Sequence, residues 1–373
     1  MKRISVAFLI LCVYFVPAAW GQKFRCLARD NWTEFHTIDM ARYNPCETVL
    51  NVDNVGTLTV LWTYTTSQKV YATPAVVSGV VYIGSFDHKF YALSAKTGTR
   101  LGSYQSGNVM GSPAVANGVV YVNANGLYAL NTKTGALLWS DATVMGFSSP
   151  AVANGVVYVG SNDNNVYALN ASTGAALWNY ATGWIVSSSP AVADGVVYVG
   201  SNTPNVYALN ASTGALLWSY TTGGAVESSP AVANGVVYVG SDDRNVYALN
   251  AGTGTLLWSF ATGDAVQSSS PAVVNGVVYV GSLDGNVYAL NATTGALLWS
   301  YATGNGVESS PAVANGVVYV GSGNGDVYAL NAETGTVLWS YATGGQVRSS
   351  PAVVNGVVYV GSFDGKVYAF GLQ

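Results

Sequence analysis

Charged residues are scarce in this chain. Aspartate, glutamate, lysine and arginine together make up only 9% of the sequence, whereas 50% of it is hydrophobic. This composition excludes a disordered chain and fits a protein with a large β-rich core. The formal net charge is −4, and residues 134–373 carry 12 acidic but only 3 basic side chains. The chain therefore lacks the basic surface of a nucleic-acid-binding protein.

Cysteine and histidine are nearly absent, with 3 and 2 residues respectively. His36 and His88 lie far apart, so we expect no zinc site, and the many serines have no nearby histidine to activate them as nucleophiles. We expect no metal and no catalytic residues. In an oxidising compartment Cys26 and Cys46 would form a disulfide that closes a short loop, and two unpaired thiols are the alternative.

Long hydrophobic runs are missing except at the start of the chain. Lys2 and Arg3 precede an uncharged apolar stretch from Ile4 to Trp20 and a small residue, Gly21. This pattern predicts a secretory signal peptide over residues 1–21, with an uncleaved membrane anchor as the alternative. We expect a periplasmic or extracellular protein whose mature chain does not span the membrane.

The dominant feature of the sequence is a repeat of about forty residues. A Pro-Ala-Val element recurs eight times, at spacings of 37 to 41 residues, with prolines at positions 74, 113, 150, 190, 230, 271, 311 and 351. Such a period is typical of one four-stranded propeller blade. Asn-Gly or Asp-Gly, as at 194–195, predicts a type I′ hairpin between the first two strands of each unit. Strands such as 196–199 are apolar at both parities, so both of their faces must be covered by neighbouring blades.

The strand count predicts how the ring closes. Eight triplets of strands follow one another, but the last one ends at Phe370 with no fourth strand, and an unattached strand lies at residues 57–65. We therefore predict an all-β fold, an eight-bladed β-propeller of four-stranded antiparallel blades over residues 57–373. The N-terminal strand would complete the last blade, and residues 22–56 would form a leader or cap.

One repeat position carries tryptophan in seven copies and Gly102 in the remaining one. We assign these tryptophans to packing between blades, because a ligand site would not be copied identically around a ring. The contact around Gly102 should be among the weaker ones. The tryptophans are Trp62, Trp139, Trp178, Trp218, Trp258, Trp299 and Trp339.

Residues 168–178, Ala-Leu-Asn-Ala-Ser-Thr-Gly-Ala-Ala-Leu-Trp, resemble the tryptophan-docking motif of pyrroloquinoline-quinone-type (quinoprotein) propeller repeats. The resemblance covers residues 57–373, although asparagine stands where that family usually has aspartate. It implies two different activities. Quinoprotein dehydrogenases hold the quinone and calcium on the axis with acidic ligands and a vicinal cysteine pair. This chain has no vicinal cysteine pair. Non-enzymatic envelope propellers, such as the lipoprotein of the outer-membrane barrel-assembly machinery, bind partner proteins.

Function in a repeated ring is expected where the copies differ. The residues three positions before each proline, and their loop neighbours, vary most and should surround one mouth of the central channel. One arc is aromatic and apolar and the other is polar and charged, which suits recognition of a peptide, a protein loop or a sugar. The predicted rim comprises Tyr71, Met110, Phe147, Trp184, Glu227, Gln267, Glu308 and Arg348.

Three functional hypotheses follow. The favoured one is a monomeric, non-catalytic exported module that binds an envelope or extracellular protein and needs no cofactor. The alternatives are a quinone- and calcium-binding oxidoreductase or its remnant, and a carbohydrate-binding propeller.

Overall fold

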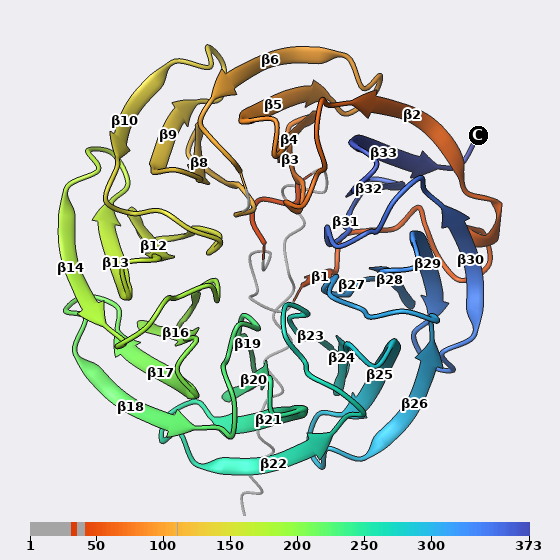
Figure 1. Ribbon diagram of the computed structural model, residues 1–373. Helices are drawn as coiled ribbons and strands as arrows, with labels where there is room; N and C mark the ends of the chain where they lie inside the picture. Colours follow the sequence, from red (N-terminus) through yellow and green to blue (C-terminus); the bar gives the residue numbers. More distant parts are fainter. Residues whose placement is uncertain (1–30, 36–41, 110) are drawn as a thin grey trace, which may run out of the picture.

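Eight antiparallel β-sheets stand around a central axis and form the blades of a propeller (Figure 1). The computed structural model describes residues 31–35, 42–109 and 111–373. Seven sheets have four strands and one has a fifth. The eight-bladed all-β fold predicted from the repeat is confirmed. The described part of the chain contains no helix that is long and apolar enough to cross a membrane. The predicted signal peptide, residues 1–21, lies outside the described residues.

The blades follow one another along the chain, and in each the first strand lies next to the axis. Blades 1 to 4 comprise β3 (Ala75–Val77), β4 (Val80–Gly84), β5 (Lys89–Ser94) and β6 (Arg100–Gln105); β7 (Ala114–Ala116), β8 (Val119–Asn123), β9 (Leu127–Asn131) and β10 (Leu137–Asp141); β11 (Ala151–Ala153), β12 (Val156–Gly160), β13 (Asn165–Asn170) and β14 (Ala176–Ala181); and β15 (Ala191–Ala193), β16 (Val196–Gly200), β17 (Asn205–Asn210) and β18 (Leu216–Thr221).

Blades 5 to 8 repeat this pattern, and the last receives its outer strand from the beginning of the chain. They comprise β19 (Ala231–Ala233), β20 (Val236–Gly240), β21 (Asn245–Asn250) and β22 (Leu256–Ala261); β23 (Ala272–Val274), β24 (Val277–Gly281), β25 (Asn286–Asn291) and β26 (Leu297–Ala302); β27 (Ala312–Ala314), β28 (Val317–Gly321), β29 (Asp326–Asn331) and β30 (Val337–Ala342); and β31 (Ala352–Val354), β32 (Val357–Gly361), β33 (Lys366–Gly371) and β2 (Thr59–Thr65).

The hairpin between the first and second strands is set by local chemistry. Asn154 and Gly155, for example, have φ angles of 51° and 76°. A type I′ turn needs positive φ at both central residues, which asparagine and glycine tolerate best. The turn joins β11 to β12 so that Ala153 lies opposite Val156.

The ring closes between the two ends of the propeller. Strand β2 pairs antiparallel with β33, with Thr59 opposite Gly371 and Thr65 opposite Lys366. Figure 1 shows this seam, where the orange β2 lies beside the blue β33. The largest hydrophobic cluster spans the seam and includes Leu58 and Phe370. The predicted closure by the N-terminal strand is therefore confirmed.

The described part of the leader contacts the first strands of several blades. Trp32 bridges to Val76 of blade 1, and the backbone N–H of Val115 in blade 2 donates to the carbonyl of Thr33. Further along, β1 (Tyr43–Asn44) runs parallel to β27 of blade 7. A short 3₁₀ helix (Val55–Thr57) then leads into β2.

Each of the seven repeated tryptophans docks on the following blade. The indole N–H of Trp178 donates to the carbonyl of Ala211 at 2.9 Å. The glycine of the next Thr-Gly corner lies under the ring, so that a Cβ at Gly214 would come within 2.7 Å of the indole. The other tryptophans donate to the carbonyl of an alanine, whereas Trp339 donates to the carbonyl of Leu58 at the seam. Between blades 1 and 2, where Gly102 replaces the tryptophan, no indole of the described residues fills this place.

Candidate functional site

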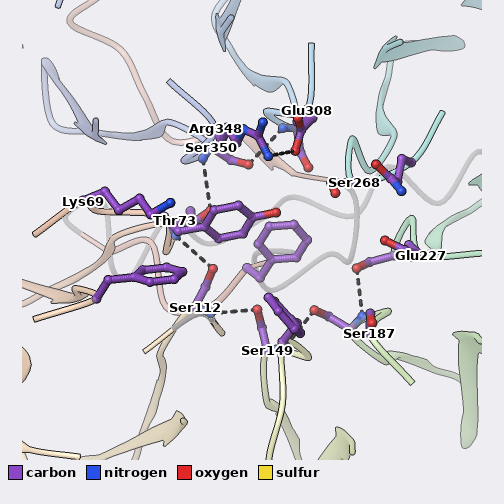
Figure 2. A pocket seen from close by; sticks show the side chains of 18 of the residues that line it. Lys69, Thr73, Ser112, Ser149, Ser187, Glu227, Ser268, Glu308, Arg348 and Ser350 are labelled. Carbon is purple, nitrogen blue, oxygen red and sulfur yellow. Dashed lines mark hydrogen bonds and ion pairs between the residues drawn. The ribbon is translucent and has the colours of Figure 1, made fainter. Parts of the chain in front are cut away.

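A cavity of about 710 Å³ lies on the axis of the propeller. Its volume is within the range of small-molecule and peptide pockets, about 300–1,000 Å³. The loops that enter the first strands of the blades line it, and in the seven blades where this position is described, the residue three before the proline lines the cavity. Figure 2 shows these side chains converging from different blades. Those that line the cavity are Tyr71, Phe147, Ser187, Glu227, Ser268, Glu308 and Arg348.

A closed circle of eight hydroxyl-bearing residues surrounds the axis, and seven of them line this cavity. The residue before each proline is serine or threonine, and its backbone N–H donates to the hydroxyl oxygen of the next one around the ring. The bonds range from 2.8 Å, between Ser270 and Ser310, to 3.3 Å, where Ser350 closes the circle on Thr73. The other members are Ser112, Ser149, Ser189 and Ser229. A hydroxyl that accepts still has a hydrogen to donate, so the circle presents donors to the cavity.

The described part of the leader contributes one side chain to the cavity. Phe35 belongs to the cavity lining, and the guanidinium of Arg42 lies 4.5 Å from its ring centroid. Arg42 is fully buried and donates to the carbonyls of Phe35, Pro311 and Pro351. Burial lowers the pKa of Arg42 to about 9. The side chain therefore connects the leader to blades 7 and 8 through the carbonyl oxygens of Pro311 and Pro351.

Glu34, next to Phe35, is also buried in the leader. Its side chain is 8% exposed, and a carboxylate oxygen accepts the backbone N–H of Val152 at 3.2 Å. Burial raises the pKa of Glu34 to about 7, and the bond from Val152 opposes that rise only in part. A carboxyl in this position holds its proton to a far higher pH than one in water.

Glu34→Gln should change how stability depends on pH. In the unfolded chain the carboxyl ionises near its usual pKa of 4.5, but in the folded chain near 7. Between these values the unfolded chain binds fewer protons, so the wild-type protein should lose about 3 kcal/mol as the pH rises from 4.5 to 7. Glutamine keeps an acceptor for Val152 and does not titrate. Other carboxyls with shifted pKa values titrate in both proteins, so urea unfolding at both pH values should show a loss about 3 kcal/mol larger in the wild type than in the variant, and equal changes would contradict the assignment.

Charged groups gather on one side of the open mouth. Arg348 forms a 2.9 Å ion pair with Glu308, and Glu227 accepts a hydrogen bond from the amide of Asn202 at 2.9 Å. Burial, followed by the nearby Asp242, raises the pKa of Glu227. Burial also raises the pKa of Glu308, against the pull of Arg348. Glu308 thus has a cationic partner, whereas the described residues provide only an amide for Glu227.

Aromatic rings surround the rest of the mouth. Tyr71 packs between Phe86 and Phe363, at centroid distances of 6.4 and 6.1 Å. The ammonium of Lys69 lies over the same two phenylalanines, 4.8 Å from the ring of Phe363. Burial raises the pKa of Tyr71, and a hydrogen bond with Ser268 of the blade 6 loop acts in the opposite direction.

The structure separates one of the predicted rim residues, Trp184, from the cavity. Trp184 is 58% exposed and does not line the cavity, whereas its neighbour Ile185 does. Met110 lies outside the described residues. Gln267 lines the cavity, together with the other predicted rim residues already placed there. The hydroxyl circle and Phe35 were missed from the sequence, although a serine or threonine before every repeat proline was visible there.

The predicted disulfide is described at only one of its ends. Cys46 is disulfide-bonded. Cys26 lies outside the described residues, so the pairing of these two cysteines stays a prediction.

The recurring aspartates between second and third strands act as turn caps. The carboxylate of Asp284 accepts the hydroxyl of Tyr288 at 2.6 Å and the N–H of Gly263 at 2.7 Å. Burial acts to raise the pKa of Asp284, but hydrogen bonds led by that from Tyr288 outweigh it, and the pKa is lowered. Among the described residues, no group of three or more His, Cys, Asp or Glu side chains could hold a metal ion.

The eight four-stranded blades, the indole docking and the axial cavity together define a propeller of the pyrroloquinoline-quinone repeat type. The chain belongs to the family described as outer membrane protein assembly factor BamB, whose family model matches residues 103–184, 181–308 and 283–372. No curated protein matches the chain by sequence.

Solved structures share the fold at low sequence identity. BamB from Moraxella catarrhalis is 21% identical with a TM-score of 0.73, over 84% of this chain and 100% of that one. The quinohemoprotein alcohol dehydrogenase from Comamonas testosteroni is 18% identical with a TM-score of 0.79, over 92% of this chain and 80% of that one. A computationally designed protein, Ika8, is 20% identical with a TM-score of 0.74, over 83% of this chain and 98% of that one. Likeness at this level shows the fold alone.

The lining of the cavity does not fit a quinone held with calcium. A calcium ion takes six to eight oxygen ligands, including carboxylates. Of the two glutamates at the mouth, Glu308 is paired with Arg348 and Glu227 is held by Asn202. No cluster of acidic side chains that could hold a metal ion is formed in the described chain.

Proposed function

We propose that this chain is an exported, non-catalytic envelope module that binds a segment of a partner protein in the open mouth of the axial cavity. The observation that carries the proposal is the contrast between the repeated structural residues of the ring and the variable residues that line the cavity. Hydroxyls and indoles repeat around the ring, but the mouth-facing residues differ from blade to blade, and Phe35 of the leader also lines the cavity. The family name, an outer membrane protein assembly factor, supports an envelope location and protein partners.

The chemistry of the mouth favours a segment that carries one cation and one apolar side chain. Glu227 is half-buried without a cationic partner among the described residues, and Phe147 is 44% exposed on the aromatic arc. A lysine or arginine of the partner would neutralise Glu227 and lower its pKa. An apolar group beside Phe147 and Ile185 would be removed from water. We propose a monomer that needs no cofactor and no nucleic acid for this binding.

Replacing Tyr71 and Phe147 together by alanine should reduce capture of the partner from native envelope extract at least about tenfold, because both rings line the cavity and aromatic anchors dominate such interfaces. Capture is quantified by mass spectrometry on immobilised protein. The matched control replaces Leu177 and Leu217, which are 52% and 51% exposed on outer strands, and should leave capture unchanged. Equal capture by both variants would count against the mouth as the interface.

A carbohydrate is the second candidate ligand of the cavity. The hydroxyl circle offers hydrogen-bond donors beside aromatic rings, which is a combination that suits a sugar. A glycan array tests it directly. Adding pyrroloquinoline quinone with calcium and following absorbance and melting temperature tests the oxidoreductase alternative, for which ligand binding would raise the melting temperature.

A further inference from the structure

The interface between blades 1 and 2 differs from the other seven. At each of those seven, the indole N–H of a tryptophan donates to a carbonyl at 2.8 to 3.0 Å. Six of the rings lie on a corner glycine, which approaches as closely as a Cβ distance of 2.5 Å at Gly98. These seven interfaces therefore indicate that the corresponding place between blades 1 and 2 has the shape of an indole ring.

At that interface no described side chain occupies the place of the ring. Gly102 in β6 stands where the tryptophan would be, and nothing lies within 4 Å of a Cβ built there. The corner glycine of blade 2, Gly135, likewise has nothing within 4 Å. A groove of about 870 Å³ occupies this region, a volume typical of ligand pockets.

The groove has both an apolar and a polar lining. Its apolar walls are formed by Tyr82, Phe90, Leu101, Tyr104, Val120 and Leu130, whereas Asn117 and Lys133 are among its polar residues. At the next interface, the carbonyl of Ala171 accepts both the hydroxyl of Tyr121 and the indole of Trp139, each at 3.0 Å. Thr132 takes the place of Ala171 in the groove, and no donor among the described residues reaches its carbonyl. The Tyr82 hydroxyl likewise has no described acceptor.

We propose that this groove is a binding site for a free indole-type small molecule, whose ring lies on Gly135 and whose N–H donates to the carbonyl oxygen of Thr132. Strand β6 is the outer strand of blade 1, and its backbone corresponds to the strand that carries the tryptophan in the other blades. The missing part is therefore a ring without a peptide chain, which favours a small molecule over the side chain of a partner. The remaining volume admits a substituent on the ring. The site is distinct from the axial cavity and does not depend on the proposed function.

The test is isothermal titration of the full chain with indole, together with ¹⁹F NMR of fluoroindole. We expect one site with a dissociation constant of about 10 μM to 1 mM, in keeping with so small a ligand. N-methylindole, which cannot donate, should bind about fivefold more weakly, since the bond to Thr132 is lost. An absence of indole binding would overturn the proposal, as would tighter binding of a tryptophan-containing peptide than of free indole.

Two variants assign the binding to this groove. Gly102→Trp should abolish indole binding and raise the melting temperature by about 2–4 °C, because the side chain fills the groove. Trp139→Gly opens the same kind of place at the next interface, over Gly174, and should raise the stoichiometry from one to two. Gly102→Trp is expected to fold at least as well as the wild type, so unchanged indole binding by this variant would overturn the assignment.

Discussion

Deletion of residues 57–65 is expected to abolish cooperative unfolding of the ring. Strand β2 completes blade 8 by pairing with β33, and it carries Trp62, which docks on blade 1 through the carbonyl of Ala95 at 2.9 Å. Its removal leaves an open edge on the last blade and breaks the contact between blades 8 and 1. A stack of blades with open ends unfolds in steps, because each unit is held only by its neighbours. Calorimetry with near-ultraviolet circular dichroism should show a broad, multistep transition.

Deletion of residues 31–50 is the matched control. It removes the described leader, including Arg42 and its bonds to blades 7 and 8, but keeps β2 in place. We expect a lower melting temperature with a single transition, since the ring remains closed. Were the 57–65 deletion to melt in one step like this control, closure by β2 would not be the source of cooperativity.

The repeat made the strand order of the blades and the closure of the ring predictable. Asn-Gly turns at a period of about forty residues fix the strand order within each blade, and the unpaired strand before the first repeat could pair only with the last. The repeat also places the residue three before each proline at the axis. The prediction of a variable mouth with Tyr71, Glu227 and Arg348 follows from that geometry.

Features that do not repeat could not be predicted from the sequence. Arg42 is held by the carbonyls of Pro311 and Pro351, which lie about 270 to 310 residues further along the chain, and no local pattern indicates such a contact. Likewise, Trp184 and Ile185 are adjacent and both apolar, and only the folded loop decides that Ile185 faces the cavity. The hydroxyl circle needs the relative height of neighbouring blades, which the period alone does not specify.

Trp218→Ala is expected to lower the free energy of unfolding by about 3–5 kcal/mol, the usual cost of removing a large buried aromatic side chain. The indole is 8% exposed, donates to the carbonyl of Ala251 at 2.8 Å and lies 5.9 Å from the ring of Tyr198. Urea unfolding monitored by far-ultraviolet circular dichroism measures the change. Leu217→Ala, at a neighbouring position that is 51% exposed, should cost less than about 0.5 kcal/mol.

A comparison of two corner glycines separates two costs of replacing such a glycine by alanine, namely the clash with the indole and the strain of the backbone. Gly254 and Gly135 have nearly equal φ angles, 71° and 69°, but only at Gly254 would a Cβ meet an indole, that of Trp218 at 2.7 Å. Alanine at either position should cost about 1–2 kcal/mol for its left-handed conformation. Gly254→Ala should cost about 1–3 kcal/mol more, because the ring must move. In a Gly102→Trp background this difference should vanish, since the new indole would lie over Gly135. If the two alanines cost the same in the wild-type chain, contact with the ring would not be the reason for glycine at these corners.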